Sequence, residues 1–292
     1  MRASTMIGSA CIALGAGIAV NSLLGPLGLK VIEYRTAETA LNQLKGADLA
    51  SLAVVAPASL AAGWMWLRRH PLAPIASLAP AAYASYTFTQ AILGVDYGRY
   101  EGNNEKFFPL HLALVVSGGA IAIRSWTELD ARVLPPLSKR LRKTAAFTLL
   151  GSAAFLTLGL HVPGLLAVWR GDPPAEYVDA PATFWVVKLM DLGIIVPAAV
   201  AAGAALLRGS PAAQRATYGL TGVLALIGAS VAAMAAVMQV NDDPSASPVF
   251  TAGFGVITVA FAVLALRLGW SAMPDREGAE AEGSAAKGAG LA

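Results

Sequence analysis

Hydrophobic positions along the chain gather into long runs, and polar residues are concentrated between them. Each run is close to the roughly 20 apolar residues that an α-helix needs to cross a bilayer. The runs occupy residues 5–29, 41–67, 71–94, 107–126, 144–169, 183–207, 216–239 and 248–268. The pattern therefore predicts an all-α integral membrane protein with eight transmembrane helices.

Composition agrees with this interpretation, because 56% of the 292 residues are hydrophobic and only 13% are charged. Soluble globular domains carry about twice that fraction of charge. The single cysteine, Cys11, excludes an intrachain disulfide and a cysteine-based zinc or iron–sulfur site. Basic residues do not combine with aromatic residues along a groove, so we expect no nucleic-acid partner.

The distribution of lysine and arginine predicts the orientation in the membrane. Thirteen of these residues fall on one side of the eight predicted spans and six on the other. Cytoplasmic loops carry an excess of positive charge, so both termini are predicted to be cytoplasmic. The predicted location is the plasma (inner) membrane, with the lipid bilayer as a partner.

A stretch in the second predicted helix recurs in the sixth. Residues 33–49 match residues 176–192 at a shift of 143 positions, and six of the seventeen positions are identical. The identical residues in the first copy are Glu33, Tyr34, Ala37, Lys45, Asp48 and Leu49.

This similarity predicts an internal repeat of four helices. Because four is an even number, both copies should insert the same way up, related by an axis along the membrane normal. We expect a first repeat over 1–133, a basic cytoplasmic linker over 134–143, a second repeat over 144–268 and a disordered cytoplasmic tail over 269–292.

Each copy places a lysine and an aspartate inside a predicted transmembrane helix. Lys188 and Asp191 are three residues apart, as are Lys45 and Asp48, so each pair shares one helical face. A charge at the bilayer centre costs roughly 2.5 to 3.5 kcal/mol and usually faces a wet cavity or a protein interior. Either the pairs form a ligand site, or each is a self-neutralising pair that holds helices together.

Other polar residues fall mostly in the outer halves of the predicted helices, which indicates an outward-facing polar cavity where the two repeats meet. The tyrosines could donate to a ligand or could be packing residues at the membrane interface. The predicted ligand-binding residues are Lys45, Asp48, Lys188, Asp191, Glu33, Glu176, Tyr83, Tyr86, Gln90, His111 and His161.

No cofactor is predicted. His111 and His161 lie in the outer halves of different helices and would be the residues for a haem or a metal, which is the less favoured alternative. The chain has no HExxH, no GxxxxGK[ST] and no GxSxG motif, so zinc-peptidase, ATP-driven and serine-hydrolase chemistry lack support.

The segments KGADLASL and FWVVKLMDLGIIVPA resemble an uncharacterised family of bacterial multi-pass membrane proteins with eight helices. The resemblance covers the helical core rather than the tail. It implies the fold and the bacterial membrane, but no activity, and therefore no catalytic residues.

Three functions remain open. The first is a protein that binds or transports a small polar or cationic solute in the outward-facing cavity. The second is an intramembrane enzyme that acts on a lipid or isoprenoid from the outer leaflet, with an aspartate as general acid or base. The third is a structural or accessory membrane subunit. Neither the substrate nor a protein partner follows from the sequence.

Overall fold

The computed structural model describes residues 3–129 and 134–272, which form helices joined by loops, without a β-strand in these ranges. The first half contains α1 (Ala3–Leu24), α2 (Glu38–Ala50), η1 (Ser51–Val55), α3 (Ala56–Leu67), α4 (Ala73–Leu93), η2 (Asn104–Phe107) and α5 (Phe108–Glu128). The second half contains α6 (Lys139–Ala154), η3 (Phe155–His161), α7 (Val162–Trp169), α8 (Ala175–Asp179), α9 (Pro181–Met190), η4 (Asp191–Ile195), α10 (Val196–Leu207), α11 (Pro211–Val240) and α12 (Pro248–Ser271).

Within residues 3–129 and 134–272, seven continuous helical stretches are long and apolar enough to cross a membrane. They are Ala3–Leu24, Glu38–Leu67, Asn104–Glu128, Lys139–Trp169, Pro181–Leu207, Pro211–Val240 and Pro248–Ser271. Large apolar side chains such as Val116, Leu189 and Leu266 are exposed on these stretches, as expected for surfaces in contact with lipid tails. The chain is therefore a multi-pass membrane protein.

The remaining predicted span, 71–94, is the helix α4, which is not among the seven. Its second half carries Tyr83, Tyr86, Thr87 and Gln90, which lower its hydropathy. The helix packs against α3, α5, α9 and α11, so neighbouring helices surround it. Its polar residues line a cavity between the two halves, as described below, and this explains why α4 is less apolar than its neighbours.

Two predicted boundaries shift by a few residues. The segment 134–143 was expected to be a linker, but α6 already begins at Lys139, where the Ser138 hydroxyl accepts a hydrogen bond from the Leu141 amide. This N-cap satisfies one of the free amides of the first turn. The helix α12 continues to Ser271, and most of the predicted tail lies outside the described residues.

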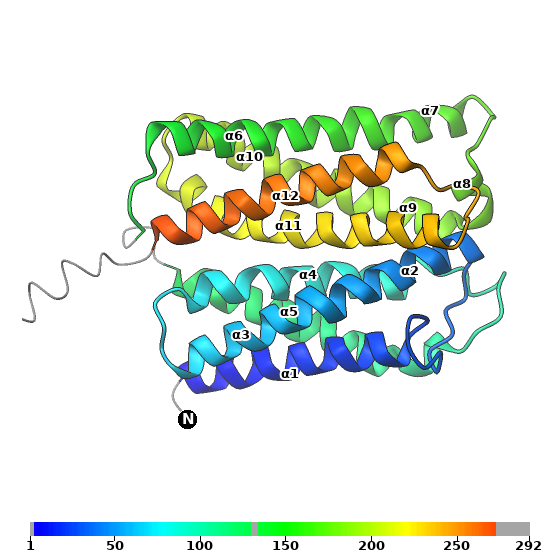
Figure 1. The fold of residues 1–292 in the computed structure, drawn as a ribbon, viewed down its shortest axis with the longest axis horizontal. Helices are drawn as coiled ribbons and strands as arrows, with labels where there is room; N and C mark the ends of the chain where they lie inside the picture. Colours follow the sequence, from blue (N-terminus) through cyan, green and yellow to red (C-terminus); the bar gives the residue numbers. More distant parts are fainter. Residues whose placement is uncertain (1–2, 130–133, 273–292) are drawn as a thin grey trace, which may run out of the picture.

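The helices of each half pack mainly with one another. In Figure 1 the helices α1 to α5 form the lower layer and α6 to α12 the upper layer. In the first half α1 packs on α3 and α4 on α5, and in the second half α6 packs on α10 and α11 on α12. Apolar residues of α1 to α5 form one large buried cluster, while Leu149, Ala199 and Phe261 belong to another in the second half.

The two halves meet along α2 and α4 of the first half and α9 and α11 of the second. The helix α11 packs against both α2 and α4, and α9 packs against α4. At Gly46 of α2 the backbones come very close, because a Cβ atom there would lie 2.3 Å from the Cα atom of Met234 in α11. Only glycine permits this approach without a shift of the helices.

Replacing Gly46 with alanine is therefore expected to force α2 and α11 apart and to lower the unfolding free energy by about 1 to 3 kcal/mol, the usual cost of overpacking. Gly151→Ala in α6 is the matched control, since no atom lies within 4 Å of the added Cβ there. Thermal unfolding of the purified variants in detergent measures both effects. Equal melting temperatures for the two variants would contradict the close contact.

Candidate functional site

Three transmembrane stretches in the described ranges contain a π-helical segment that ends two residues before a proline. η1, η3 and η4 are followed by Pro57, Pro163 and Pro197, each at the start of the next α-helix. Proline has no N–H to donate and its ring clashes with the preceding turn, so the backbone widens there. Such widened turns are frequent at functional sites. Here the three segments carry Ser51, His161 and Asp191, which all join buried hydrogen-bond contacts.

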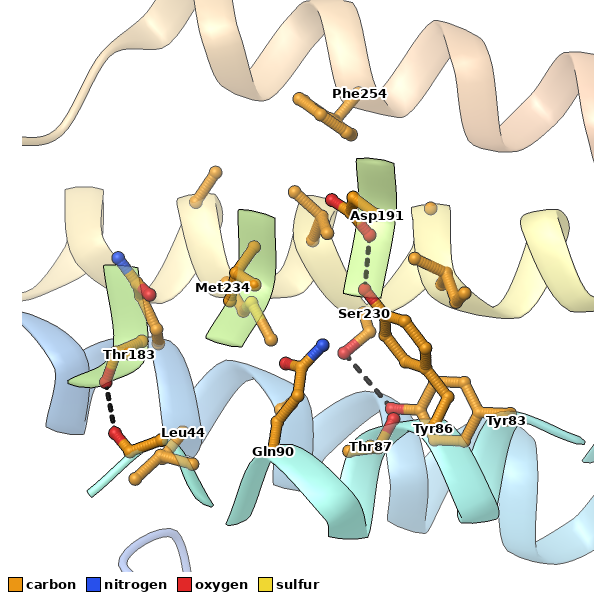
Figure 2. A pocket seen from close by; sticks show the side chains of 18 of the residues that line it. Leu44, Tyr83, Tyr86, Thr87, Gln90, Thr183, Asp191, Ser230, Met234 and Phe254 are labelled. Carbon is orange, nitrogen blue, oxygen red and sulfur yellow. Dashed lines mark hydrogen bonds between the residues drawn. The ribbon is translucent and has the colours of Figure 1, made fainter. Parts of the chain in front are cut away.

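Asp191, the first residue of η4, connects the two halves. Its Oδ1 atom accepts a hydrogen bond from the hydroxyl of Tyr86 in α4. Figure 2 shows this contact, with Tyr86 reaching across from the first half. The Oδ2 atom lies 2.8 Å from Nε2 of His161 in η3. Asp191 is 8% exposed and His161 is 2% exposed, so this pair is almost completely removed from solvent and lipid.

A second contact chain joins the halves beside the first. The Tyr83 hydroxyl lies 3.2 Å from Oγ of Ser51 in η1 and 3.1 Å from Oγ of Ser230 in α11. Figure 2 shows Tyr83 and Tyr86 side by side on α4, directed to different partners. Two tyrosines one helical turn apart therefore hold η1, η4 and α11 around α4.

A cavity of about 290 Å³, which we call the main chamber, lies between the two halves. Residues of α2, α4, α9, η4, α11 and α12 line it. Its polar wall includes Gln43, Asp48, Tyr83, Tyr86, Thr87, Gln90, Glu176 and Asp191. Its apolar wall includes Phe155, Met234, Met238, Phe250, Phe254 and Phe261. Figure 2 shows Gln90 and Met234 projecting into the same space.

A smaller cavity of about 120 Å³, the side chamber, lies next to the main chamber. Glu176, Leu160, Thr183 and Val187 line both cavities. His161 and Lys188 line the side chamber but not the main one.

Lys188 and Asp191 do not form the self-neutralising pair that their spacing allows. Among the described residues, the ion pair of Lys188 is with Glu176, whose Oε1 lies 3.6 Å from Nζ. The same Nζ lies 3.3 Å from the ring centroid of Phe184, a cation–π contact. The lysine therefore turns toward the side chamber, and Asp191 faces the main chamber with His161 and Tyr86 as partners.

The first copy of the motif has different contacts. Lys45 donates to Oδ1 of Asn42 at 3.0 Å, and the Asn42 amide donates to Asp243 at 3.0 Å. Asp48 lines the main chamber, but its Oδ2 atom is buried against the loop that follows α1, where a Cβ on Gly25 would lie only 2.5 Å away. Neither Lys45 nor Lys188 is held by the aspartate three residues further on.

Glu33 and His111 line neither chamber. The backbone of Glu33 bonds Asn103 and Asn104 in the loop before α5, so this residue belongs to a loop network rather than to a cavity wall. His111 is buried in the first half, where its Nε2 lies 3.2 Å from the Tyr34 hydroxyl and 3.0 Å from Oδ1 of Asn21.

His111 and His161 thus have different side-chain partners at Nε2, and no side chain in the described residues contacts both histidines. Within the described ranges, no group of three or more histidine, cysteine, aspartate or glutamate side chains is arranged to hold a metal ion.

At the end of the bundle where α8 lies, hydrogen bonds hold the two halves together. Arg99 donates to the Val178 carbonyl, and the Tyr100 hydroxyl donates to the Asp179 carbonyl at 2.7 Å. Arg35 pairs with Glu105 at 2.8 Å and stabilises the loop from which Arg99 and Tyr100 come. The short helix α8, which carries Glu176, is therefore fixed to the first half.

Sequence reasoning missed several residues of the two chambers. Ser51, Ser230 and Thr183 are short hydroxyl residues in apolar helices, where nothing in the sequence separates them from packing residues. His161 was predicted as a site residue, and Pro163 is a further signal for it, because a proline inside a transmembrane run predicts disturbed backbone two residues from this histidine. The aromatic wall from α12 carried no such signal.

Comparison of the chain with protein-family models, with curated proteins and with solved structures finds no match.

Proposed function

We propose that this membrane protein binds a small organic cation in the main chamber and transports it. One observation carries the proposal: three carboxylates, those of Asp48, Glu176 and Asp191, are among the residues that line this chamber, and no lysine, arginine or histidine in the described ranges does. Lys188, whose spacing would allow it to neutralise Asp191, is held by Glu176 and Phe184 instead. A bound cation would therefore meet carboxylates without a competing basic side chain on the chamber wall.

The walls and the size of the chamber favour an organic cation rather than a bare ion. Tyr86, Phe155 and Phe250 offer ring surfaces to a cation, and Met234 and Met238 add apolar side chains to the wall. Small-molecule pockets span about 300 to 1,000 Å³, so the chamber of about 290 Å³ suits a small ligand. A metal ion would need more oxygen ligands at closer spacing than the carboxylates supply.

The arrangement of the halves supports transport between them. We infer that the halves are repeats, because the helix pairs α1/α3, α3/α4 and α4/α5 correspond to α6/α10, α10/α11 and α11/α12. In this correspondence α2 is equivalent to α9, and α4 is equivalent to α11. The contact of α2 with α11 is then equivalent to the contact of α9 with α4, and both contacts are present. A pseudo-twofold axis would then pass between α4 and α11, beside the main chamber. This gives eight passes, including α4, and we retain the expectation of cytoplasmic termini.

Binding of quaternary ammonium ions tests this proposal. Tetramethylammonium, tetraethylammonium and benzyltrimethylammonium carry a permanent charge and increasing apolar surface. At least one of them is expected to raise the melting temperature of the detergent-purified protein in a concentration-dependent way, whereas the neutral alcohol 3-ethyl-3-pentanol should not. Calorimetric titration gives the dissociation constant.

Asp191→Asn is expected to weaken this binding at least tenfold, because the amide keeps the shape of the side chain and loses its charge. Asp172→Asn, in an exposed loop, is the matched control and should bind normally. The proposal is wrong if none of the three cations binds, if the neutral alcohol binds equally well, or if Asp191→Asn binds as tightly as the unchanged protein.

A second function is favoured by the contact of His161 with Asp191. A carboxylate that orients an imidazole makes the other ring nitrogen a better general base, and here Nδ1 of His161 has no hydrogen-bond partner among the described residues. An intramembrane enzyme acting on a lipid would use such a base. Incubation with membrane lipids followed by mass spectrometry would detect a product that His161→Gln fails to form.

A further inference from the structure

We propose that Asp191 and His161 together hold one proton in the empty protein, and that a cation entering the main chamber displaces this proton into the side chamber. This proposal rests on the proposed function, because it describes how the same chamber releases and accepts its cation. It makes the protein a cation–proton exchanger.

The charge balance of the buried pair is the first reason. Within the described structure, His161 is the ion-pair partner of Asp191, and no lysine or arginine lies within salt-bridge distance of its carboxylate. An uncompensated charge is costly at such a site, so the empty pair should carry a proton that keeps it neutral overall. An organic cation beside Asp191 supplies the same positive charge and removes the need for the proton.

The position of the pair is the second reason. Asp191 lines the main chamber and His161 lines the side chamber, so the pair forms part of the wall between them. Nε2 of His161 bonds Asp191, while Nδ1 is buried and without a partner in the described residues. The two ring nitrogens therefore have different surroundings. A histidine that passes a proton from the main chamber to the side chamber needs this difference.

The exchange step is balanced as follows. In the empty state the imidazolium of His161 is hydrogen-bonded to the Asp191 carboxylate. When a quaternary ammonium ion contacts the carboxylate, the imidazolium loses the proton on Nδ1 to water that reaches the side chamber. The neutral imidazole keeps its Nε2–H bond to Asp191, and the carboxylate becomes the counter-ion of the ligand. One positive charge enters and one leaves.

The charged and titratable groups around Asp191 and His161 do not take part in this proton exchange. The hydroxyl group of Tyr86 in α4 donates a hydrogen bond to Asp191 and keeps its proton. Lys188 of α9 and Glu176 of α8 neutralise each other beside the side chamber. Asp179 of α8 lines the side chamber. Asp48 of α2 lines the main chamber, is 7% exposed and has no basic partner in the described residues, so the same cost keeps it neutral in the empty protein.

Proton release on cation binding tests the exchange. The quaternary ammonium ion that binds best is added to the full-length protein in weakly buffered detergent solution, and the released protons are measured with a pH electrode. Because this ligand has no proton of its own, every released proton comes from the protein. We expect close to one proton per bound cation. Since protons and cations compete, the dissociation constant should rise about tenfold per unit decrease in pH while the pair is protonated.

His161→Gln separates a proton carrier from a residue with a purely structural role. The glutamine amide can still donate to Asp191 but holds no proton, so binding should persist and the midpoint of its pH dependence should move by at least one unit. His70→Gln, in an exposed loop, is the matched control and should change neither quantity.

The outcomes distinguish the two proposals. If a cation binds without proton release and with the same affinity from pH 5 to pH 9, the exchange is wrong and the binding function stands. An unchanged midpoint in His161→Gln also overturns the exchange through this residue. If no quaternary ammonium ion binds, the proposed function itself is wrong.

Discussion

His161→Leu is expected to lower the unfolding free energy by about 3 to 5 kcal/mol, which is the usual cost of removing one partner of a buried ion pair. The substitution leaves the Asp191 carboxylate 8% exposed with the Tyr86 hydroxyl as its remaining partner. No basic side chain in the described structure is close enough to replace the imidazole. Unfolding in mixed detergent micelles, followed by tryptophan fluorescence, measures the loss.

The double variant His161→Leu/Asp191→Leu should recover most of this stability, because it removes both members of the pair. The matched comparison is Lys188→Leu/Asp191→Leu. These two residues have separate partners, so their effects should add, with little coupling. The experiment also tests a purely structural role for the Lys188 and Asp191 pair, which requires that their joint replacement leave folding nearly intact. Strong coupling between Lys188 and Asp191, with none between His161 and Asp191, would contradict the contacts described above.

The helical architecture was predictable because the bilayer imposes it locally. A segment that crosses lipid must bury its own backbone hydrogen bonds and present about 20 apolar residues, and both properties can be recognised along the sequence. Seven predicted spans coincide with helices that meet these conditions. The predicted span 71–94 also forms a helix, but its polar residues face a chamber and neighbouring helices shield it from lipid.

The partners of the buried charges were not predictable, because they come from helices far apart in the chain. The spacing of Lys188 and Asp191 shows that they share a face, but Tyr86 is 105 positions from Asp191 and is brought to it by the packing of α4 against α9. His161 was a candidate residue on its own, and its contact with Asp191 depends on the way η3 meets η4.

The two copies of the sequence motif are separated by a different number of residues than the two π-helical segments η1 and η4. The sequence match pairs Asp48 with Asp191 at 143 positions, whereas the π-helical segments begin at Ser51 and Asp191, 140 positions apart. Pro57 and Pro197 have this second spacing. Three residues are nearly one helical turn. In the repeat that we propose, Asp191 would therefore correspond to Ser51, and both residues contact a tyrosine of α4. Asp48 and Asp191 are identical in the sequence match but lie at different positions relative to the π-helical segment, because the position of this segment follows the proline.

Thr87→Trp is expected to abolish cation binding, with at least a tenfold loss of affinity, while the protein still folds. Thr87 lines the main chamber from α4, between Tyr86 and Gln90. The chamber of about 290 Å³ is at the lower end of the range for ligand pockets, so an indole side chain would take up much of the space that a ligand needs. Calorimetric titration with the best quaternary ammonium ion measures the loss.

Thr89→Trp is the matched control for this substitution. It introduces the same side chain on the same helix, two positions further on, and Thr89 is not among the residues that line either chamber. Successive positions on a helix turn by 100°, so two positions place the side chain on nearly the opposite face. Thr89→Trp should bind the cation with an affinity within threefold of the unchanged protein. If Thr87→Trp binds equally well, the ligand does not occupy the main chamber, and the carboxylates there act on something other than a bound cation.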